Sequence, residues 1–456
     1  MSNNSDNLFH LCLSLESYLI NVGIWVGVFL IIVFALFCAF KHSKKAANKL
    51  SLFLIIICPI NIFDYGIRSF CGPVGGWPKS LLILWSVFTL TLPLIALFAI
   101  IKTKFSDKFF ENFIKVSIAP CILLLLYGFQ TSFIDSTISK KPVYMDGNPA
   151  HLILFDMLSY DLLFQGSQVD QRFLNFKEFS IDCDVFLSAK SPGKTTGQTI
   201  PRLFAGSDLI SVGHDRDTPW LIKPPGHEDM IDLAEYENIL SIFHDANYNI
   251  FLQAFAMPYT KAFSRHIQFG KVYPYDTLWR IGFHSLIWPI IYPGGLAHQR
   301  TADSILENYK AGIFNNPPNT FYYTHWNIPH PPFIYDSTGG KLSRWELIKR
   351  MVRKDNKEGF LHQLVGTDLV FGEVISAMKQ SGKYDKSLII VIADTNAKGF
   401  GFDSQHVPLF IKRPYQSEQR IVYDAVQTIE IKEYLKAFLH EHVGKNFDLE
   451  FERLNL

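Results

Sequence analysis

The sequence predicts an N-terminal bundle of transmembrane helices over residues 1–135, followed over residues 136–456 by an α/β domain with a mainly parallel central sheet flanked by helices. Two observations predict this fold class. The N-terminal third contains long apolar runs with few or no charges, as membrane spans do. After residue 136, short apolar runs alternate with segments of helical periodicity, which is typical of α/β domains.

The first apolar run, residues 18–40, contains no charged residue. A helix of this length, rising about 1.5 Å per residue, can cross a hydrocarbon core about 30 Å thick. Similar runs occupy residues 80–101 and 116–134, whereas the run at residues 50–67 is shorter and carries Pro59 and Asp64. We therefore expect about four spans, with Asp64 either at the membrane interface or in a functional role.

Lysines indicate how the spans are oriented. They concentrate in the segments at residues 41–49 and 102–115, whereas the loop between the second and third spans has only Arg68 and Lys79. The lysine-rich segments are expected in the cytoplasm, which places the α/β domain on the other side. The sequence thus predicts a multi-pass protein of the cell (inner) membrane with a large extracytoplasmic or periplasmic domain. Residues 1–16 lack Lys and Arg, so we do not expect the first span to be a cleaved signal peptide.

Charge and cysteine content exclude two classes of partner and site. The formal net charge is +1, and the large domain has no sustained basic stripe, so no nucleic-acid partner is expected. Cys183 is the one cysteine after residue 136, which rules out a disulfide framework or a cysteine-based zinc site there.

Short apolar runs in the second part of the chain predict buried, parallel strands. They lie at residues 151–155, 249–255, 320–324, 388–393 and 407–411. Apolar residues at helical spacing over residues 360–378 predict a helix, and residues 424–442 are expected to form an amphipathic helix on the domain surface.

Two carboxylates follow predicted strands. Asp156 ends the run at residues 151–155, and Asp394 follows the run at residues 388–393. Taken singly, each could be an ordinary helix cap. As a pair at neighbouring strand ends, they could share a divalent cation, because such cations need hard oxygen ligands from separate elements.

A hydroxyl-rich segment at residues 191–206 precedes a short predicted helix and includes Thr196 and Thr199. Its hydroxyls could be helix caps, and spacing alone favours that interpretation. The same position suits a nucleophile that attacks phosphorus, because helix N-termini stabilise anions. Histidines also lie at strand ends: His325 and His330 follow one predicted strand, and His406 precedes another. Such histidines can be structural, or can contact metals and phosphates.

Together these segments resemble the membrane-anchored branch of the sulfatase-like, alkaline-phosphatase-type superfamily, which includes phosphoethanolamine transferases and lipoteichoic acid synthases. The resemblance covers most of residues 148–415. It rests on residues 151–156, 196–206, 325–332, 361–394 and 406–409.

The resemblance implies an alkaline-phosphatase-like fold and a role for each candidate residue. Thr196 would be the nucleophile, with Asp156 and Asp394 as metal ligands. Substrate contacts would come from His330, His406, His325 and Thr199.

Two departures from the family pattern matter. Where the family has Asp-His-Gly, this chain has Asp394-Thr395-Asn396, so a degenerate metal site would rely on oxygens of Thr395 or Asn396. Such oxygens favour a harder cation, although Mn, Zn, Mg and Ca all stay open. The family's sulfatases need Cys or Ser at the nucleophile position, so Thr196 disfavours sulfate-ester hydrolysis and fits the phospho-transferring branch.

The expected function is therefore a metal-dependent transferase. It would move a phospho-substituent, such as phosphoethanolamine or phosphoglycerol, from a membrane lipid donor to an extracytoplasmic glycan or lipid acceptor. Two alternatives stay open: a catalytically inactive relative that binds a glycan, lipid or protein partner, and a phosphodiesterase or phosphatase that uses water.

Overall fold

The computed structural model describes residues 137–209, 211–213, 220–255, 257–273, 294–352 and 357–443. All the predicted membrane spans, and with them residues 1–135, lie outside this part of the chain. Among the residues described, no helix combines the length and the apolar character that a membrane crossing requires.

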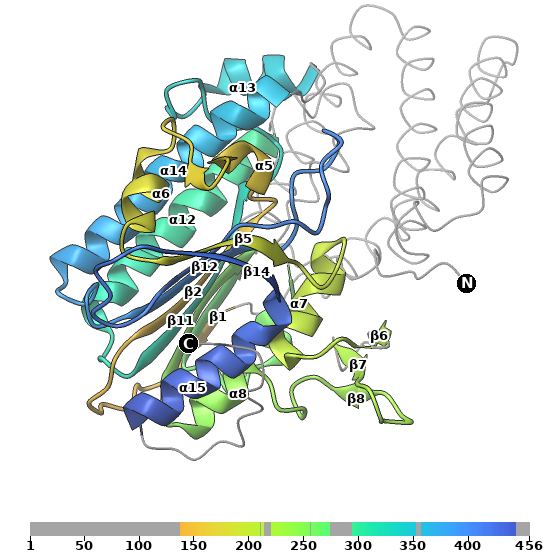
Figure 1. Ribbon diagram of the computed structural model, residues 1–456, viewed down its shortest axis with the longest axis vertical. Helices are drawn as coiled ribbons and strands as arrows, with labels where there is room; N and C mark the ends of the chain where they lie inside the picture. The colour runs from red at the N-terminus through yellow and green to blue at the C-terminus, as the bar shows by residue number, and fades with distance from the viewer. Residues whose placement is uncertain are drawn as a thin grey trace, which may run out of the picture. The chain divides into compact units, whose positions relative to one another are not determined.

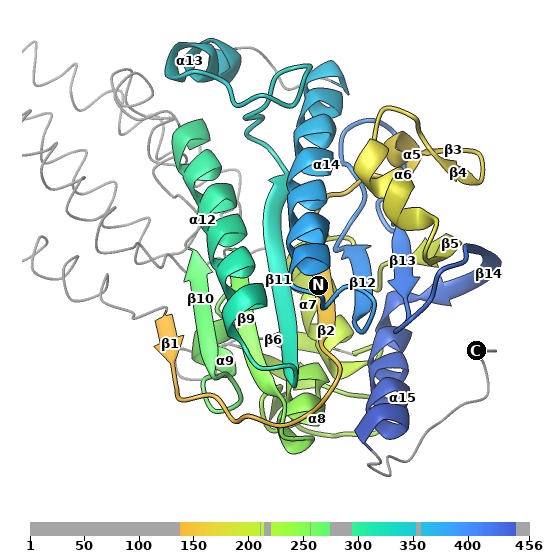
Figure 2. The same ribbon diagram turned by 90° about the vertical axis from the view of Figure 1, so that its left-hand side faces the viewer.

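A nine-stranded sheet forms the centre of the described part, in the order β1-β10-β9-β11-β2-β12-β13-β5-β14 (Figures 1 and 2). Its strands are β1 (Thr137–Ser139), β2 (Ala150–Asp156), β5 (Asp184–Lys190), β9 (Asn249–Phe255), β10 (Phe269–Tyr273), β11 (Thr320–Pro329), β12 (Leu388–Ala393), β13 (Leu409–Lys412) and β14 (Arg420–Gln427). All strands except β1 and β13 run in one direction. The predicted mainly parallel sheet is confirmed.

Helices cover both faces of the sheet (Figure 1). One face carries α6 (Leu174–Ser180), α12 (Gly294–Asn315) and α14 (Lys357–Gln380), and the other carries α7 (Thr196–Ala205), α8 (Ile239–Asp245) and α15 (Ile431–Val443). The remaining elements are α5 (Tyr160–Leu163), α9 (Tyr259–Ala262), α13 (Arg344–Val352), the 3-10 helix η3 (Thr428–Glu430), the hairpin of β3 (Phe164–Gln165) and β4 (Gln168–Val169), and a small sheet of β6 (Ser211–Gly213), β7 (Leu221–Lys223) and β8 (Ile231–Asp232).

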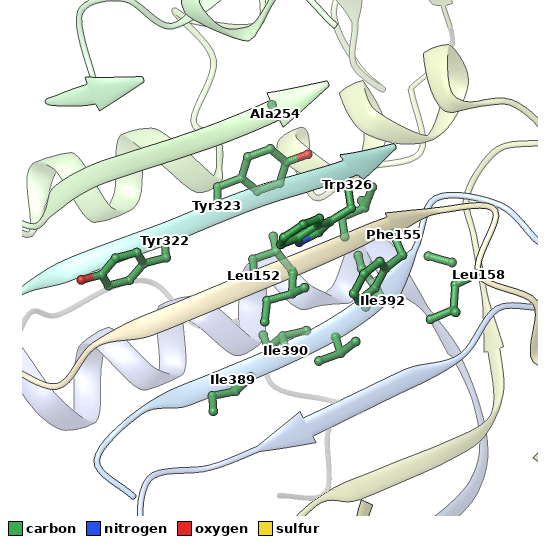
Figure 3. Packing of buried hydrophobic residues seen from close by; sticks show 14 of the residues in the cluster. Leu152, Phe155, Leu158, Ala254, Tyr322, Tyr323, Trp326, Ile389, Ile390 and Ile392 are labelled. Carbon is green, nitrogen blue, oxygen red and sulfur yellow. The ribbon is translucent and has the colours of Figure 1, made fainter. Parts of the chain in front are cut away.

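The strands in the middle of the sheet are buried along their whole length. Leu152 and Phe155 of β2, Trp326 of β11, and Ile390 and Ile392 of β12 have no exposed surface (Figure 3). Helices lie against both faces, so these strands have no solvent-facing side, and they appear in the sequence as continuous apolar runs rather than as an alternating pattern. This is why β9 and β12 match their predicted bounds.

Some sequence expectations about strands and helices were wrong. The strand predicted at residues 320–324 extends to Pro329, so His325 lies within β11 rather than in the loop after it. The run at residues 407–411 contributes to β13, but this strand is antiparallel to both β12 and β5. Residues 424–427 belong to β14, so the C-terminal helix begins only at Ile431. Strand β14 lies at the edge of the sheet and exposes several side chains, so its sequence lacks the continuous apolar run of a central strand.

The stretch with the most specific family resemblance, residues 361–394, contains residues that pack α14 against its surroundings. Gln363 Oε1 accepts a 2.8 Å hydrogen bond from the Ile334 amide. Asp368 accepts a 2.8 Å bond from the Phe176 amide, near the start of α6. A Cβ on Gly372 would lie 2.2 Å from Asn175 Oδ1, so a larger residue here would displace the Asn175 side chain, which donates a 2.8 Å hydrogen bond to Asp368.

Candidate active site

The two predicted carboxylates are neighbours at the carboxyl ends of adjacent strands. Strands β2 and β12 are parallel, with Phe155 opposite Ala393, so Asp156 and Asp394 come next on each strand. Both side chains are buried, at 6% and 0% exposure. This is the edge of a parallel sheet at which ligands usually bind.

Burial raises the pKa of both carboxyl groups. It raises the pKa of Asp156 to about 7, against a smaller lowering effect of Lys398. Burial also raises the pKa of Asp394 to about 7, and the adjacent charge of Asp156 adds to that rise. Two buried carboxylates side by side repel each other when both are ionised, so the pair favours either a shared proton or a bound cation.

Thr196 points at this pair. It is the first residue of α7, and its hydroxyl donates a 2.5 Å hydrogen bond to Asp394 Oδ2. The N-cap position is occupied by Thr195, whose side chain makes no capping hydrogen bond. The capping interpretation therefore does not describe Thr196, whose hydroxyl is directed at a carboxylate instead.

Backbone amides orient the Asp394 carboxylate. Its Oδ1 accepts hydrogen bonds from the amides of Met157, at 2.9 Å, and Thr395, at 2.7 Å. Met157 has a φ of 66°, in the left-handed region that non-glycine residues rarely adopt. This tight turn after β2 directs the Met157 N–H toward Asp394 Oδ1. The other oxygen, Oδ2, accepts the hydrogen bond from the Thr196 hydroxyl.

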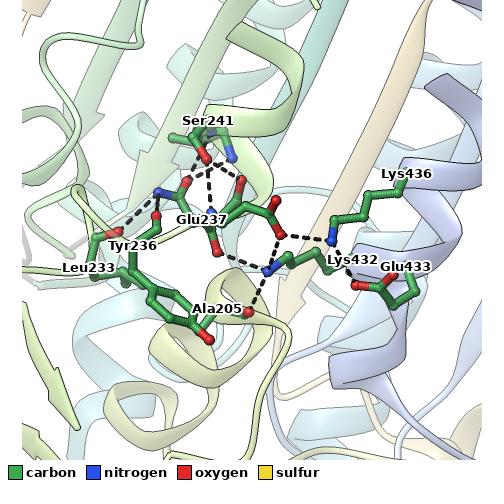
Figure 4. A network of polar contacts seen from close by, with 10 residues as sticks. Ala205, Leu233, Tyr236, Glu237, Ser241, Lys432, Glu433 and Lys436 are labelled. Atoms are coloured by element: carbon green, nitrogen blue, oxygen red, sulfur yellow. Dashed lines mark hydrogen bonds and ion pairs between the residues drawn. The ribbon is translucent and has the colours of Figure 1, made fainter. Parts of the chain in front are cut away.

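The far end of α7 is anchored to α15 (Figure 4). Gly206 ends the helix in the left-handed conformation, and Lys432 Nζ donates 2.9 Å hydrogen bonds to the carbonyl oxygens of Ala205 and Glu237. Lys432 also pairs with the Glu237 carboxylate at 3.0 Å. A cation at a helix C-terminus satisfies carbonyl groups that have no partner within the helix.

Thr199 lies one turn after Thr196 and is fully buried. Its hydroxyl is 2.9 Å from Ser191 Oγ, so the structure places it in a contact between elements rather than on an open surface. The sequence analysis predicted that Thr199 would contact substrate.

The three predicted histidines occupy different environments. His325 is buried, its Nδ1 lies 2.9 Å from the Tyr259 hydroxyl, and burial lowers its pKa to about 3. His330 is half-buried, with Nδ1 2.5 Å from the Pro331 carbonyl oxygen. His406 is half-buried, donates from Nε2 to the Leu187 carbonyl at 2.9 Å, and lies against Tyr160 with ring centroids 3.8 Å apart.

The structure adds two residues that the sequence interpretation missed. Lys398 is exposed, and its positive charge partly offsets the rise in pKa that burial causes at Asp156 and Asp394. His298 of α12 is 6% exposed, and burial lowers its pKa to about 3. Lys398 could have been noticed as a charged residue shortly after Asp394, whereas nothing in the local pattern of α12 singles out His298.

The donor set fits a hard divalent cation. Asp156, Asp394 and Thr196 offer carboxylate and hydroxyl oxygens, and the buried Thr395 Oγ1 has no hydrogen-bond partner. Such oxygens suit Mg²⁺, Ca²⁺ or Mn²⁺ better than a nitrogen- and sulfur-preferring ion. Within the described ranges, no three His, Cys, Asp or Glu side chains form a group that could hold a metal.

Asn396, the other predicted metal ligand, is held elsewhere. Its Nδ2 donates a 2.6 Å hydrogen bond to Asp161 Oδ2 and a 3.0 Å bond to the Asp403 carbonyl. Its Oδ1 accepts a 2.8 Å bond from the Ala397 amide. We therefore leave Asn396 out of the proposed ligand set.

Comparisons with known proteins give fold-level neighbours. No protein-family profile matches the sequence, and no curated protein is similar to it in sequence. Among solved structures, phosphonate monoester hydrolase SpPMH from Silicibacter pomeroyi is 16% identical with a TM-score of 0.45, over 66% of this chain and 74% of that one. A putative sulfatase from Bacteroides thetaiotaomicron is 12% identical with a TM-score of 0.44, over 67% and 72%.

A third neighbour, Ps i-CgsB in complex with k-i-k-neocarrahexaose, is 16% identical with a TM-score of 0.46, over 67% of this chain and 73% of that one. The neighbours thus include sulfatases and a phosphonate monoester hydrolase. With TM-scores below 0.5, they carry no conclusion about activity.

Proposed function

We propose that this chain is a membrane-anchored, metal-dependent transferase that moves a phospho-substituent from a phospholipid to an extracytoplasmic glycan or lipid. The observation that carries the proposal is the 2.5 Å hydrogen bond from the Thr196 hydroxyl to Asp394 Oδ2, beside Asp156. A hydroxyl bonded to a carboxylate of raised pKa has the arrangement of an activated nucleophile.

In the first step, Thr196 Oγ1 attacks the donor phosphorus while the bond from phosphorus to the lipid alcohol oxygen breaks. The Thr196 proton passes to Asp394 Oδ2, its hydrogen-bond acceptor. A bound divalent cation, held by Asp156 and Asp394, would neutralise negative charge on the phosphoryl oxygens. His330 or His406 would give a proton to the leaving lipid oxygen, so the products are Thr196 carrying the phospho-substituent and a free lipid alcohol.

In the second step, the acceptor hydroxyl attacks phosphorus and the bond from phosphorus to Thr196 Oγ1 breaks. Thr196 Oγ1 recovers its proton from Asp394, and the acceptor proton returns to the histidine that protonated the lipid oxygen. His330 and His406 are the candidates to hold the phosphoryl oxygens or to protonate the leaving lipid oxygen. Nε2 of His406 is bonded to Leu187, so its contact with substrate would come from Nδ1. His325, buried against Tyr259, is the weaker candidate.

Strand β1 begins on the side of the sheet that carries the candidate site. Strand β1 is antiparallel to β10 and pairs Thr137 with Lys271, so Thr137 lies toward the carboxyl ends of the parallel strands. Asp156 and Asp394 lie at those carboxyl ends. The last predicted span ends at residue 134, shortly before β1.

Mass spectrometry of Thr196 tests the proposal. Full-length protein in lipid nanodiscs would be incubated with phosphatidylethanolamine or phosphatidylglycerol and Mn²⁺ or Mg²⁺, without acceptor. The wild type should carry a phospho-adduct on Thr196, and Thr196→Val should carry none. Thr195→Val is the matched control, because the Thr195 hydroxyl has no hydrogen-bond partner.

Full donor turnover in Thr196→Val would overturn the mechanism. The same assay, repeated with glycan acceptors, separates the alternatives. Donor cleavage that does not increase with any glycan acceptor indicates a phosphodiesterase or phosphatase that uses water. No turnover together with no binding of divalent cation indicates an inactive relative that binds its partner.

A further inference from the structure

Ser191 joins the parts of the candidate site. It directly follows β5 and has no exposed surface. Its hydroxyl oxygen lies 2.6 Å from the Asp394 carbonyl oxygen and 2.9 Å from Thr199 Oγ1. One side chain therefore contacts both the strand end that carries Asp394 and the helix that carries Thr196.

The single hydroxyl proton of Ser191 determines which groups in these hydrogen bonds donate and which accept. A serine hydroxyl has one proton, and the nearest acceptor is the Asp394 carbonyl, ahead of the Gly193 carbonyl at 3.0 Å. The Thr199 hydroxyl must then donate to Ser191 Oγ. The resulting chain runs from Thr199 through Ser191 to the Asp394 backbone, with every member buried.

The backbone of Ser191 is hydrogen-bonded to the loop that carries His406. Its amide donates to the Gln405 carbonyl at 2.8 Å, and its carbonyl accepts from Gln405 Nε2 at 2.9 Å. Lys190 and His406, the neighbours of these two residues, form an isolated antiparallel bridge. The loop that carries His406 is thus tied to the same point as α7 and β12.

We propose that Ser191 is a positioning residue, which sets the distance between Thr196 and Asp394 and the place of the His406 loop. Its effect on rate rests on the proposed function, whereas its effect on geometry does not. Without the Ser191 hydroxyl, Thr199 and the Asp394 carbonyl lose their shared partner, and α7 can shift relative to β12. A shift of about 1 Å at a reacting group can lower a rate on the order of a hundredfold.

The test compares Ser191→Ala with Ser387→Ala. Ser387 is equally buried and its hydroxyl donates one 2.7 Å hydrogen bond, to the Lys383 carbonyl, so it controls for general loss of stability. Ser191→Ala should slow formation of the Thr196 adduct about ten- to a hundredfold, with KM nearly unchanged. Ser387→Ala should lower the unfolding temperature but leave the rate unchanged.

Variants at Thr199 provide the conservative rescue. Thr199→Val removes the hydroxyl at nearly constant volume and should slow the reaction as Ser191→Ala does. Thr199→Ser retains the hydroxyl and should recover most of the lost rate. Equal rates in the wild type, Ser191→Ala and Thr199→Val would overturn the inference.

A structural measurement separates this inference from the proposed function. If the wild type forms no Thr196 adduct, the proposed function fails, and crystal structures of wild type and Ser191→Ala decide the inference. We expect the distance from Thr196 Oγ1 to Asp394 Oδ2 to lengthen beyond hydrogen-bonding distance in the variant. An unchanged distance would show that Ser191 does not position this pair.

Discussion

Thr196 and Asp394 lie 198 residues apart in the chain and are joined by a 2.5 Å hydrogen bond. The helix that begins at Thr196 and the strand that ends before Asp394 are each formed by local sequence, yet neither determines this contact. The contact brings a hydroxyl to a carboxylate whose pKa is raised by burial and by the charge of Asp156. Several consequences of this arrangement can be measured.

Stability of the cation-free protein should fall as pH rises through the titration of Asp156 and Asp394. Their pKa values rise from 3.8 to about 7 on folding, so between these values the native state holds protons that the unfolded state has released. Unfolding then becomes easier with rising pH. Asp156→Asn removes one of the like charges and should raise the free energy of unfolding at pH 8 by about 1–3 kcal/mol.

Thermal unfolding across pH 4 to 8, followed by tryptophan fluorescence, measures this dependence. Asp229→Asn, at an exposed carboxylate, should leave the slope unchanged. A wild-type protein without cation that becomes more stable between pH 5 and pH 8, by an amount that Asp156→Asn does not alter, would contradict the assignment.

Divalent cations should compete with these protons. Binding of Mn²⁺ should tighten as pH rises toward 8 and should release protons, which calorimetry in two buffers of different ionisation enthalpy detects. Asp394→Asn should weaken binding at least about tenfold. Asn396→Ala should leave the affinity nearly unchanged, because the Asn396 amide is bonded to Asp161 and to the loop. Equal losses in the two variants would place Asn396 among the ligands.

Variants of His325 and His330 should affect different properties, the first stability and the second activity. Burial lowers the pKa of His325 to about 3, so this side chain stays neutral near pH 7 and contributes no titration there. His325→Leu removes one of two partners of the Tyr259 hydroxyl, which also lies 2.8 Å from the Tyr323 hydroxyl, and should lower the free energy of unfolding by about 1–3 kcal/mol. His330→Ala should lower the rate of Thr196 modification with little change in stability. The opposite pattern, a stable but inactive His325→Leu, would assign the substrate contact to His325.

Lys432 should matter more for stability than its neighbour Lys436. Lys432→Met keeps the apolar stem but leaves the carbonyl groups of Ala205 and Glu237 without their donor, which should lower the free energy of unfolding by about 1–3 kcal/mol. Lys436→Met loses ion pairs to Glu237 and Glu433 and should have a smaller effect, below about 1 kcal/mol. Chemical denaturation of both variants makes the comparison.

Gly372→Ala should destabilise the protein through a steric overlap. The added Cβ would lie 2.2 Å from Asn175 Oδ1, which should lower the free energy of unfolding by about 1–3 kcal/mol. Asn175→Ala removes the overlapping atoms, so the double variant should be more stable than the sum of the two single effects predicts. Additive effects would mean that α6 moves away from α14 without strain.

The sequence determined the elements that depend on local pattern. Continuous apolar runs identified β9 and β12 within their bounds, because strands covered on both faces must be apolar throughout. The residues after such runs, Asp156 and Asp394, were identified as a pair because parallel strands end at one edge of a sheet. Thr196 was named as a nucleophile only through the family resemblance, and the segment at residues 191–206, which was expected to precede a helix, contains α7 itself.

Tertiary structure decided what each side chain contacts. The pairing of β13 with β5, the pairing of the edge strand β14 with β5, and the contact of Ser191 with Asp394 each join segments more than a hundred residues apart in the chain. The same holds for Asn396, whose amide is bonded to Asp161. Periodicity and propensity report the burial of a position, whereas a hydrogen-bond partner is chosen by packing between distant elements, which no local pattern records.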